Sequence, residues 1–198
     1  MNELSHAEST RTADHPIEDL ILRRWSPRAM NSDAITDDEM LRLFEAARWA
    51  PSTYNEQEWR FLYARRETAE WSRFFALLTE ANQAWCKNAA MLVAIVAHTV
   101  FAKNGNANPV HLFDCESAFE NLSLQGTAMG LVVHGMSGFD YEAARTSLAV
   151  PDRFAVAAMF AVGHPGDAAE LPEGFRAIEK PSGRRPVKES IREGAFSF

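Results

Sequence analysis

The sequence of 198 residues predicts a layered α/β or α+β fold, with helices on both faces of a sheet. Apolar, strand-like runs alternate with amphipathic, helix-like segments in the order α, α, β, α, β, α, β, α, β. After residue 166 the chain becomes polar and irregular, with few residues to form a second core. We therefore expect one domain over 16–198, preceded by a flexible tail at 1–15.

The first half of the chain contains the clearest helix signals. A short helix is expected within 16–23. Thr36 and Glu39 match a capping box, and apolar residues recur at helical spacing behind them until Pro51 prevents continuation. A strand at 59–64 follows this helix.

The second half continues the alternation. Residues 69–90 are expected to be helical, although their pattern is less regular, and 91–97 read as a strand buried on both faces. From Leu112 to Met129 the apolar residues step by three and four, which predicts a long helix with Gly130 as its C-cap. The remaining expected elements are a short strand at 131–134, a helix from Asp140 to about 150, and a buried strand at 154–162.

Composition excludes several classes of function. The formal net charge of −7 argues against nucleic acid as the main partner. The longest apolar run, 89–97, is too short to span a membrane, and the first residues lack an apolar signal core, so we expect a cytoplasmic protein. Cys86, Cys115 and the six histidines show no metal-ligand spacing, so no metal site is expected. Neither a Rossmann nor a P-loop fingerprint occurs.

The string Arg24-Trp25-Ser26-Pro27-Arg28 is the first that suggests chemistry. Pro27 favours an extended conformation at Ser26, and side chains two apart on an extended segment share a face. Arg24, Ser26 and Arg28 would then point the same way across roughly 13 Å, at about 3.3 Å per residue. Such a row suits a phosphorylated ligand. A solvated basic patch would show the same string, and the string alone leaves both interpretations open.

The second string is the polar loop that follows the helix ending near Pro51. It contains Ser52, Thr53, Asn55 and Gln57 before the strand at 59–64 begins. These small donors and acceptors could line the edge of a polar heteroaromatic ring. Ordinary turn chemistry uses the same residue types, so this string is also ambiguous by itself.

Taken together and in order, these strings resemble the nitroreductase family. Arg24–Arg28 match the family's R-x-S-x-R-like opening, and Ala50–Trp59 match its A-P-S-S-x-N-x-Q-P-W stretch. Leu131–Phe139 look like the family's short strand and glycine-containing loop, and Gly183–Glu189 resemble its closing R-x-P segment. The resemblance runs from about residue 17 to the end. At Glu58 the chain departs from the proline that is usual in the family, and Trp25 and Tyr54 also differ.

The resemblance implies the following flavin-binding residues. The ribityl phosphate would be bound by Arg24, Ser26, Arg28 and Arg184, with Arg185 as the alternative to Arg184 and with Trp25 contributing its backbone. The flavin of the other subunit would be reached by Pro51, Ser52, Thr53 and Asn55, in a loop shaped by Gln57. The flavin ring would be approached by Asn82 and by the backbone of Ser137 and Gly138.

The resemblance also implies a fold and an activity. The fold is a mixed central sheet with helices on both faces, in a homodimer whose C-terminal arm crosses to the partner subunit. The activity is ping-pong transfer of electrons from a transient NAD(P)H donor, through non-covalent FMN, to a small acceptor such as a nitroaromatic or a quinone. FMN carries the chemistry, so no catalytic side chain is assigned. Three alternatives stay open, namely a flavin-binding protein with little turnover, a dehalogenase and a flavin-degrading enzyme.

Overall fold

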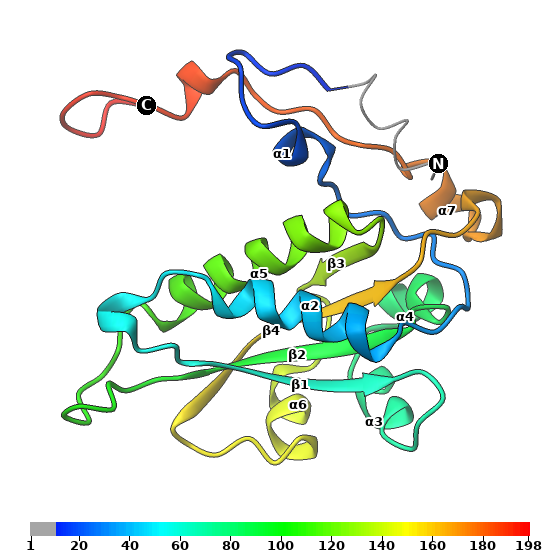
Figure 1. Ribbon diagram of the computed structural model, residues 1–198, viewed down its shortest axis with the longest axis horizontal. Helices are drawn as coiled ribbons and strands as arrows, with labels where there is room; N and C mark the ends of the chain where they lie inside the picture. The colour runs from blue at the N-terminus through cyan, green and yellow to red at the C-terminus, as the bar shows by residue number, and fades with distance from the viewer. Residues whose placement is uncertain (1–10) are drawn as a thin grey trace.

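The computed structural model describes residues 11–198 and is built around a four-stranded sheet (Figure 1). The strands are β1 (Trp59–Arg65), β2 (Met91–His98), β3 (Val132–Met136) and β4 (Phe154–Gly163). Their order across the sheet is β1-β2-β4-β3. Strand β2, one of the two central strands, is almost wholly buried, as its uninterrupted apolar sequence predicts.

All three strand pairings in the described residues are antiparallel, so the expectation of a mixed sheet was wrong for this part of the chain. The long helix after β2 does connect two strands that run in the same direction, β2 and β3. However, β4 lies between them and pairs antiparallel with each. The two parallel strands, β2 and β3, are therefore not neighbours, because the last strand in the sequence, β4, lies between them.

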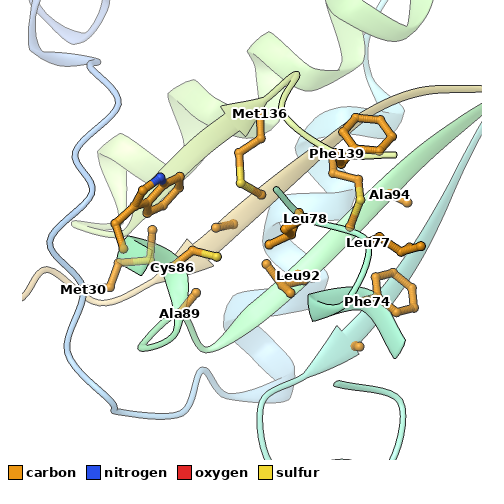
Figure 2. Close-up of a cluster of buried hydrophobic side chains, with 14 of the residues drawn as sticks. Met30, Phe74, Leu77, Leu78, Cys86, Ala89, Leu92, Ala94, Met136 and Phe139 are labelled. Carbon is orange, nitrogen blue, oxygen red and sulfur yellow. The ribbon is translucent and has the colours of Figure 1, made fainter. Parts of the chain in front are cut away.

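Helices cover both faces of the sheet, as predicted. On one face, α2 (Asp37–Arg48) and α5 (His111–Ala128) pack on the sheet through an apolar cluster that includes Leu43, Leu122 and Phe160. On the other face lie α3 (Trp71–Phe75), α4 (Glu80–Cys86) and α6 (Tyr141–Ser147). Figure 2 shows the cluster on that second face, where Phe74 and Leu78 gather around Leu92 of β2. Successive residues of β2 point to opposite faces and so enter both clusters.

Local signals placed the ends of the two long helices correctly. At the start of α2, Thr36 and Glu39 form the predicted capping box, in which each side chain bonds the other residue's backbone N–H. At the end of α5, Gly130 adopts a φ of +73°, and the N–H of Leu131 donates to the carbonyl of Gly126 at 2.8 Å. This left-handed residue ends the helix and turns the chain into β3.

The segment predicted as helical over 69–90 forms two short helices, α3 and α4. Between them Leu78 bridges to Phe139, and the N–H of Thr79 donates to the carbonyl of Gly138 at 3.0 Å. The break therefore depends on contacts with a loop about 60 residues away, which helical spacing does not reveal.

After β4 the chain leaves the sheet as a long arm beside the N-terminal segment. The arm contains only short helices, η3 (Ala168–Glu170), α7 (Glu173–Arg176) and η4 (Val187–Glu189). Figure 1 shows the orange and red arm running along the dark blue residues that precede α1 (Asp19–Arg23). Asp14 accepts a hydrogen bond from the N–H of Val187 at 2.7 Å, so the predicted tail makes contacts within its described part.

Candidate functional site

The segment between α1 and α2 and the C-terminal arm enclose a polar cavity of about 270 Å³, here called the arginine cavity. The structure brings together five of the predicted phosphate-binding residues at its wall, namely Arg24, Trp25, Ser26, Arg28 and Arg184. Arg24 is extended, with φ −62° and ψ 121°, and its Nη1 lies 3.3 Å from Ser26 Oγ. The shared face predicted for Arg24 and Ser26 is therefore present.

The arginine cavity carries more positive than negative charge. Arg24 lies 3.5 Å from Glu120, and Arg28 lies 3.6 Å from Glu179. Glu179 also accepts hydrogen bonds from the backbone N–H groups of Arg28 and Ala29, at 2.6 and 2.8 Å. These two carboxylates face five cationic side chains at the wall, Arg11, Arg24, Arg28, Lys180 and Arg184. Such an excess suits an anionic ligand that presents several acceptors.

His134 of strand β3 lines the arginine cavity. Its Nδ1 lies 2.8 Å from the carbonyl of Pro27, and its ring packs on Trp85 with centroids 4.5 Å apart. Burial lowers the pKa of His134, and the nearby Arg28 lowers it further, while the bond to Pro27 and the Glu179 carboxylate oppose the shift. His134 is therefore neutral at pH 7, with Nδ1–H as the donor to Pro27.

A chain of contacts leads from His134 to the predicted ring-binding residues. Trp85 Nε1 donates to Asn82 Oδ1 at 3.1 Å, and Asn82 Nδ2 donates to the carbonyl of Gly138 at 2.9 Å. Asn82 and the Ser137–Gly138 loop are thus side by side. A Cβ at position 138 would lie only 2.7 Å from Asn82 Nδ2 and 3.0 Å from Thr79 Oγ1, so the close approach requires glycine.

The loop predicted to contact a flavin lies elsewhere. The arginine cavity is lined by none of the predicted loop residues, Pro51, Ser52, Thr53, Asn55 and Gln57. Figure 1 shows the loop after the C-terminal end of α2, at the left, whereas the segment between α1 and α2 passes at the right. Within one chain the two predicted halves of the site therefore stay apart.

The 51–57 loop has an unusual backbone. Tyr54, Asn55 and Gln57 all have positive φ, at 55°, 59° and 50°. Such conformations cost on the order of 1–3 kcal/mol each for ordinary side chains and concentrate at functional sites. Two anchors hold the loop in this form, since Thr53 N–H donates to Asp114 at 2.8 Å and Gln57 N–H donates to Ser52 Oγ at 3.0 Å.

Arg184 and Arg185 differ in position. Arg184 lines the arginine cavity, whereas Arg185 does not; both arginines line a hollow of about 570 Å³ between residues 12–22 and the arm. Sequence reasoning missed five residues that line the arginine cavity, namely Arg11, His134, Ile178, Lys180 and Ser182, and it also missed Glu179, the partner of Arg28. Arg11 lies in the segment predicted as a tail, and Glu179 is brought to Arg28 across 151 positions, so no local pattern marked either.

No helix in the described part of the chain is long and apolar enough to cross a membrane. Over the same residues, no group of three or more metal-ligating side chains occurs. Cys86 and Cys115 are buried free thiols, and burial raises the pKa of each to about 12.

Comparison with known families agrees with the geometry. The model of the nitroreductase family matches residues 21–164. The chain belongs to the nitroreductase family. That match covers the arginine-bearing segment, the 51–57 loop and the loop at Gly138, and it leaves Arg11 and the C-terminal arm outside.

The individual relatives of this nitroreductase-family chain share about a quarter to a third of its residues. A protein from Archaeoglobus fulgidus named "Putative NADH dehydrogenase/NAD(P)H nitroreductase" is 26% identical over 165 residues, which cover 78% of this chain and 88% of the relative. A crystal structure described as an oxidoreductase containing FMN has a TM-score of 0.90 at 35% identity, covering 94% of this chain and 96% of the other. A "putative nitroreductase in complex with FMN" from Desulfovibrio desulfuricans has a TM-score of 0.72 at 24% identity, covering 93% and 100%, which supports the fold alone.

Proposed function

We propose that the protein is an FMN-dependent oxidoreductase, which moves electrons from NAD(P)H to a small acceptor such as a nitroaromatic or a quinone. The observation that carries the proposal is the arginine cavity, where Arg24, Ser26, Arg28 and Arg184 meet. Two further facts support it, namely the FMN named in a structure 35% identical to this chain and the NAD(P)H nitroreductase names of curated relatives.

The residues of the arginine cavity fit the phosphate end of FMN. A phosphate dianion offers several acceptor oxygens, and guanidinium groups bind such oxygens with paired N–H donors. The indole N–H of Trp25 is buried beside the cavity and has no acceptor within the described residues, so it is a further unfilled donor. In this proposal Arg24, Arg28 and Arg184 bind the phosphate, and Glu179 holds Arg28 in place.

The ring end of FMN is assigned to Asn82 and the Ser137–Gly138 loop. The contacts from Pro27 through His134 and Trp85 to Asn82 connect this loop with the arginine cavity. Because Gly138 has no Cβ, Asn82 and Thr79 can pack closely against its backbone, which holds Asn82 beside the Ser137–Gly138 loop. Neutral His134 lies between the two ends and adds no positive charge.

The remaining surface of the flavin is assigned to a second subunit, so the working form is a homodimer. A cavity of about 270 Å³ is smaller than the roughly 300–1,000 Å³ typical of ligand pockets. No side chain of the strained 51–57 loop lines that cavity. Two large aromatic side chains in and beside the loop are instead exposed, Tyr54 to 89% and Trp49 to 72%. Burial against a partner would cover both rings and bring the loop to the partner's flavin. The exposed apolar residues of the C-terminal arm, such as Ile191 and Phe196, suit the same partner.

When bound, FMN would supply the redox chemistry that links NAD(P)H to the acceptor. The protein's own residues bind the phosphate, orient the ring and limit access to it. A dedicated dinucleotide-binding motif is absent from the sequence, so NAD(P)H and the acceptor are assigned in turn to one open flavin face, in a ping-pong scheme. Two buried free thiols suit a reducing compartment, which supports assignment to the cytoplasm.

Flavin titration tests the proposal. Purified protein freed of ligand is titrated with FMN and with riboflavin, and binding is followed by quenching of flavin fluorescence. We expect one FMN per chain and clearly weaker binding of riboflavin, because the latter lacks the phosphate. Failure to bind FMN, or equal affinity for the two flavins, would remove the arginine cavity's proposed role.

A further inference from the structure

Arg11 holds together the two chain segments that supply the phosphate-facing arginines. Its Nη1 donates to the carbonyls of Leu22 at 2.9 Å and Arg24 at 2.5 Å. Its Nε donates to the carbonyl of Ser182 in the C-terminal arm at 3.0 Å. One guanidinium therefore connects the segment of Arg24 with the segment of Arg184, although these lie 160 positions apart in the sequence.

The charge around Arg11 indicates that the arrangement is built for an anion. Arg11 lines the arginine cavity and an adjoining hollow of about 270 Å³, and it shares both with Arg24 and Arg184. Within the described residues neither Arg11 nor Arg184 has a carboxylate partner. Partial burial lowers the pKa of Arg11, and so do the charges of Arg184 and Arg24 beside it. An arginine remains charged in this setting, and of the three guanidinium groups only that of Arg24 has a carboxylate nearby among the described residues, Glu120 at 3.5 Å, so a bound anion would reduce their mutual repulsion.

Nothing in the family match accounts for Arg11, because the matched region begins at residue 21. The hydrogen bonds of Arg11 also go to carbonyl groups of both segments rather than to one neighbour. A solvated surface arginine would not connect three parts of the backbone in this way.

We propose that Arg11 is a further cofactor-positioning residue, which fixes Arg24 and Arg184 around the phosphate of FMN and adds its own charge there. The N-terminal segment is then part of the flavin site. This inference rests on the proposed function, since it presumes that a flavin phosphate enters the arginine cavity.

The test compares Arg11→Ala, Arg11→Lys and wild type in FMN and riboflavin titrations. Arg73→Ala serves as the control, because Arg73 is an exposed arginine on α3 whose ion-pair partner is Glu70. We expect Arg11→Ala to weaken FMN binding about tenfold or more, as for loss of a hydrogen bond involving a charged group, with little change for riboflavin. Arg11→Lys should recover only part of the loss, because an ammonium keeps the charge without the planar fork. Arg73→Ala should match wild type for both flavins.

Several outcomes would overturn the inference. Unchanged FMN affinity in Arg11→Ala would show that the residue does not serve the phosphate. Equal losses for FMN and riboflavin would assign Arg11 to the fold, and full recovery in Arg11→Lys would show that charge alone matters. Failure of wild type to bind FMN would contradict the proposed function itself. Equal FMN binding by wild type and Arg11→Ala would contradict only the role of Arg11.

Discussion

Glu58 and Asp114 form a buried pair of carboxyl groups beneath the 51–57 loop. Their exposed fractions are 1% and 3%. Asn108 Nδ2 donates to Glu58 Oε1 at 2.8 Å, while Oε2 has no hydrogen-bond donor among the described residues. Burial raises the pKa of Glu58, and the Asp114 carboxyl beside it raises the pKa further, although Asn108 opposes the shift. The raised pKa favours the protonated form of Glu58 in the folded protein.

Glu58→Gln should stabilise the protein at neutral and higher pH. A glutamine keeps the acceptor for Asn108 and offers Asp114 a permanent N–H donor. A raised pKa in the folded state means that Glu58 contributes most below its ordinary value, about 4.3, and that this contribution is lost as pH rises through the folded value. The advantage of glutamine should thus be small near pH 4 and grow toward pH 8. We expect the free energy of unfolding of Glu58→Gln to exceed that of wild type by about 1–2 kcal/mol at pH 8. This is the scale of a hydrogen bond to a charged group less the cost of desolvation.

Urea unfolding at several pH values measures this effect. Wild type, Glu58→Gln and the control Glu116→Gln are compared by circular dichroism, and the free energy of unfolding is obtained by linear extrapolation. Glu116 is an exposed residue on the same helix as Asp114, so its variant should follow wild type closely. A Glu58→Gln variant less stable than wild type at pH 8, or one whose difference from wild type is independent of pH, would refute the raised pKa of Glu58.

Further predictions concern the flavin site and the assembly. Arg28→Ala should weaken FMN binding by about 1.5–3 kcal/mol, the range for a hydrogen bond to a charged group, and riboflavin binding much less; equal losses in titrations would assign Arg28 to the fold. Gly138→Ala should weaken both flavins alike, about tenfold or more, because its Cβ would displace Asn82 at the ring end; a loss confined to FMN would contradict that assignment. Sedimentation at low micromolar concentration should give about twice the chain mass of 22.1 kDa, and a flavin-loaded monomer would exclude the shared site. Double-reciprocal plots at several fixed acceptor concentrations should be parallel, whereas intersecting lines would require a second pocket.

Features encoded over a few residues could be predicted from the sequence. The capping box at Thr36 and the left-handed glycine at Gly130 were both predicted, because each depends on neighbours within one helical turn. Arg24 is extended, which agrees with the extended string that was predicted. The motif order then identified the family.

Features that depend on distant segments could not be predicted in this way. The position of β4 between β2 and β3 comes from pairing of strands, and it decided against a mixed sheet. The break between α3 and α4 depends on Gly138, and the orientation of Arg28 depends on Glu179. Arg11 was missed for the same reason, because its partners at Leu22, Arg24 and Ser182 share no sequence pattern with it.

Anaerobic reduction of the FMN-loaded protein tests the central claim most directly. The protein is mixed with NADH or NADPH without any acceptor, and the absorption bands of oxidised flavin are followed. We expect the bands to bleach with at least one of the two donors and to return when menadione or a nitroaromatic is added. Bands that persist with both donors would contradict the assignment as an NAD(P)H-dependent oxidoreductase and would indicate a protein that binds flavin without turning it over.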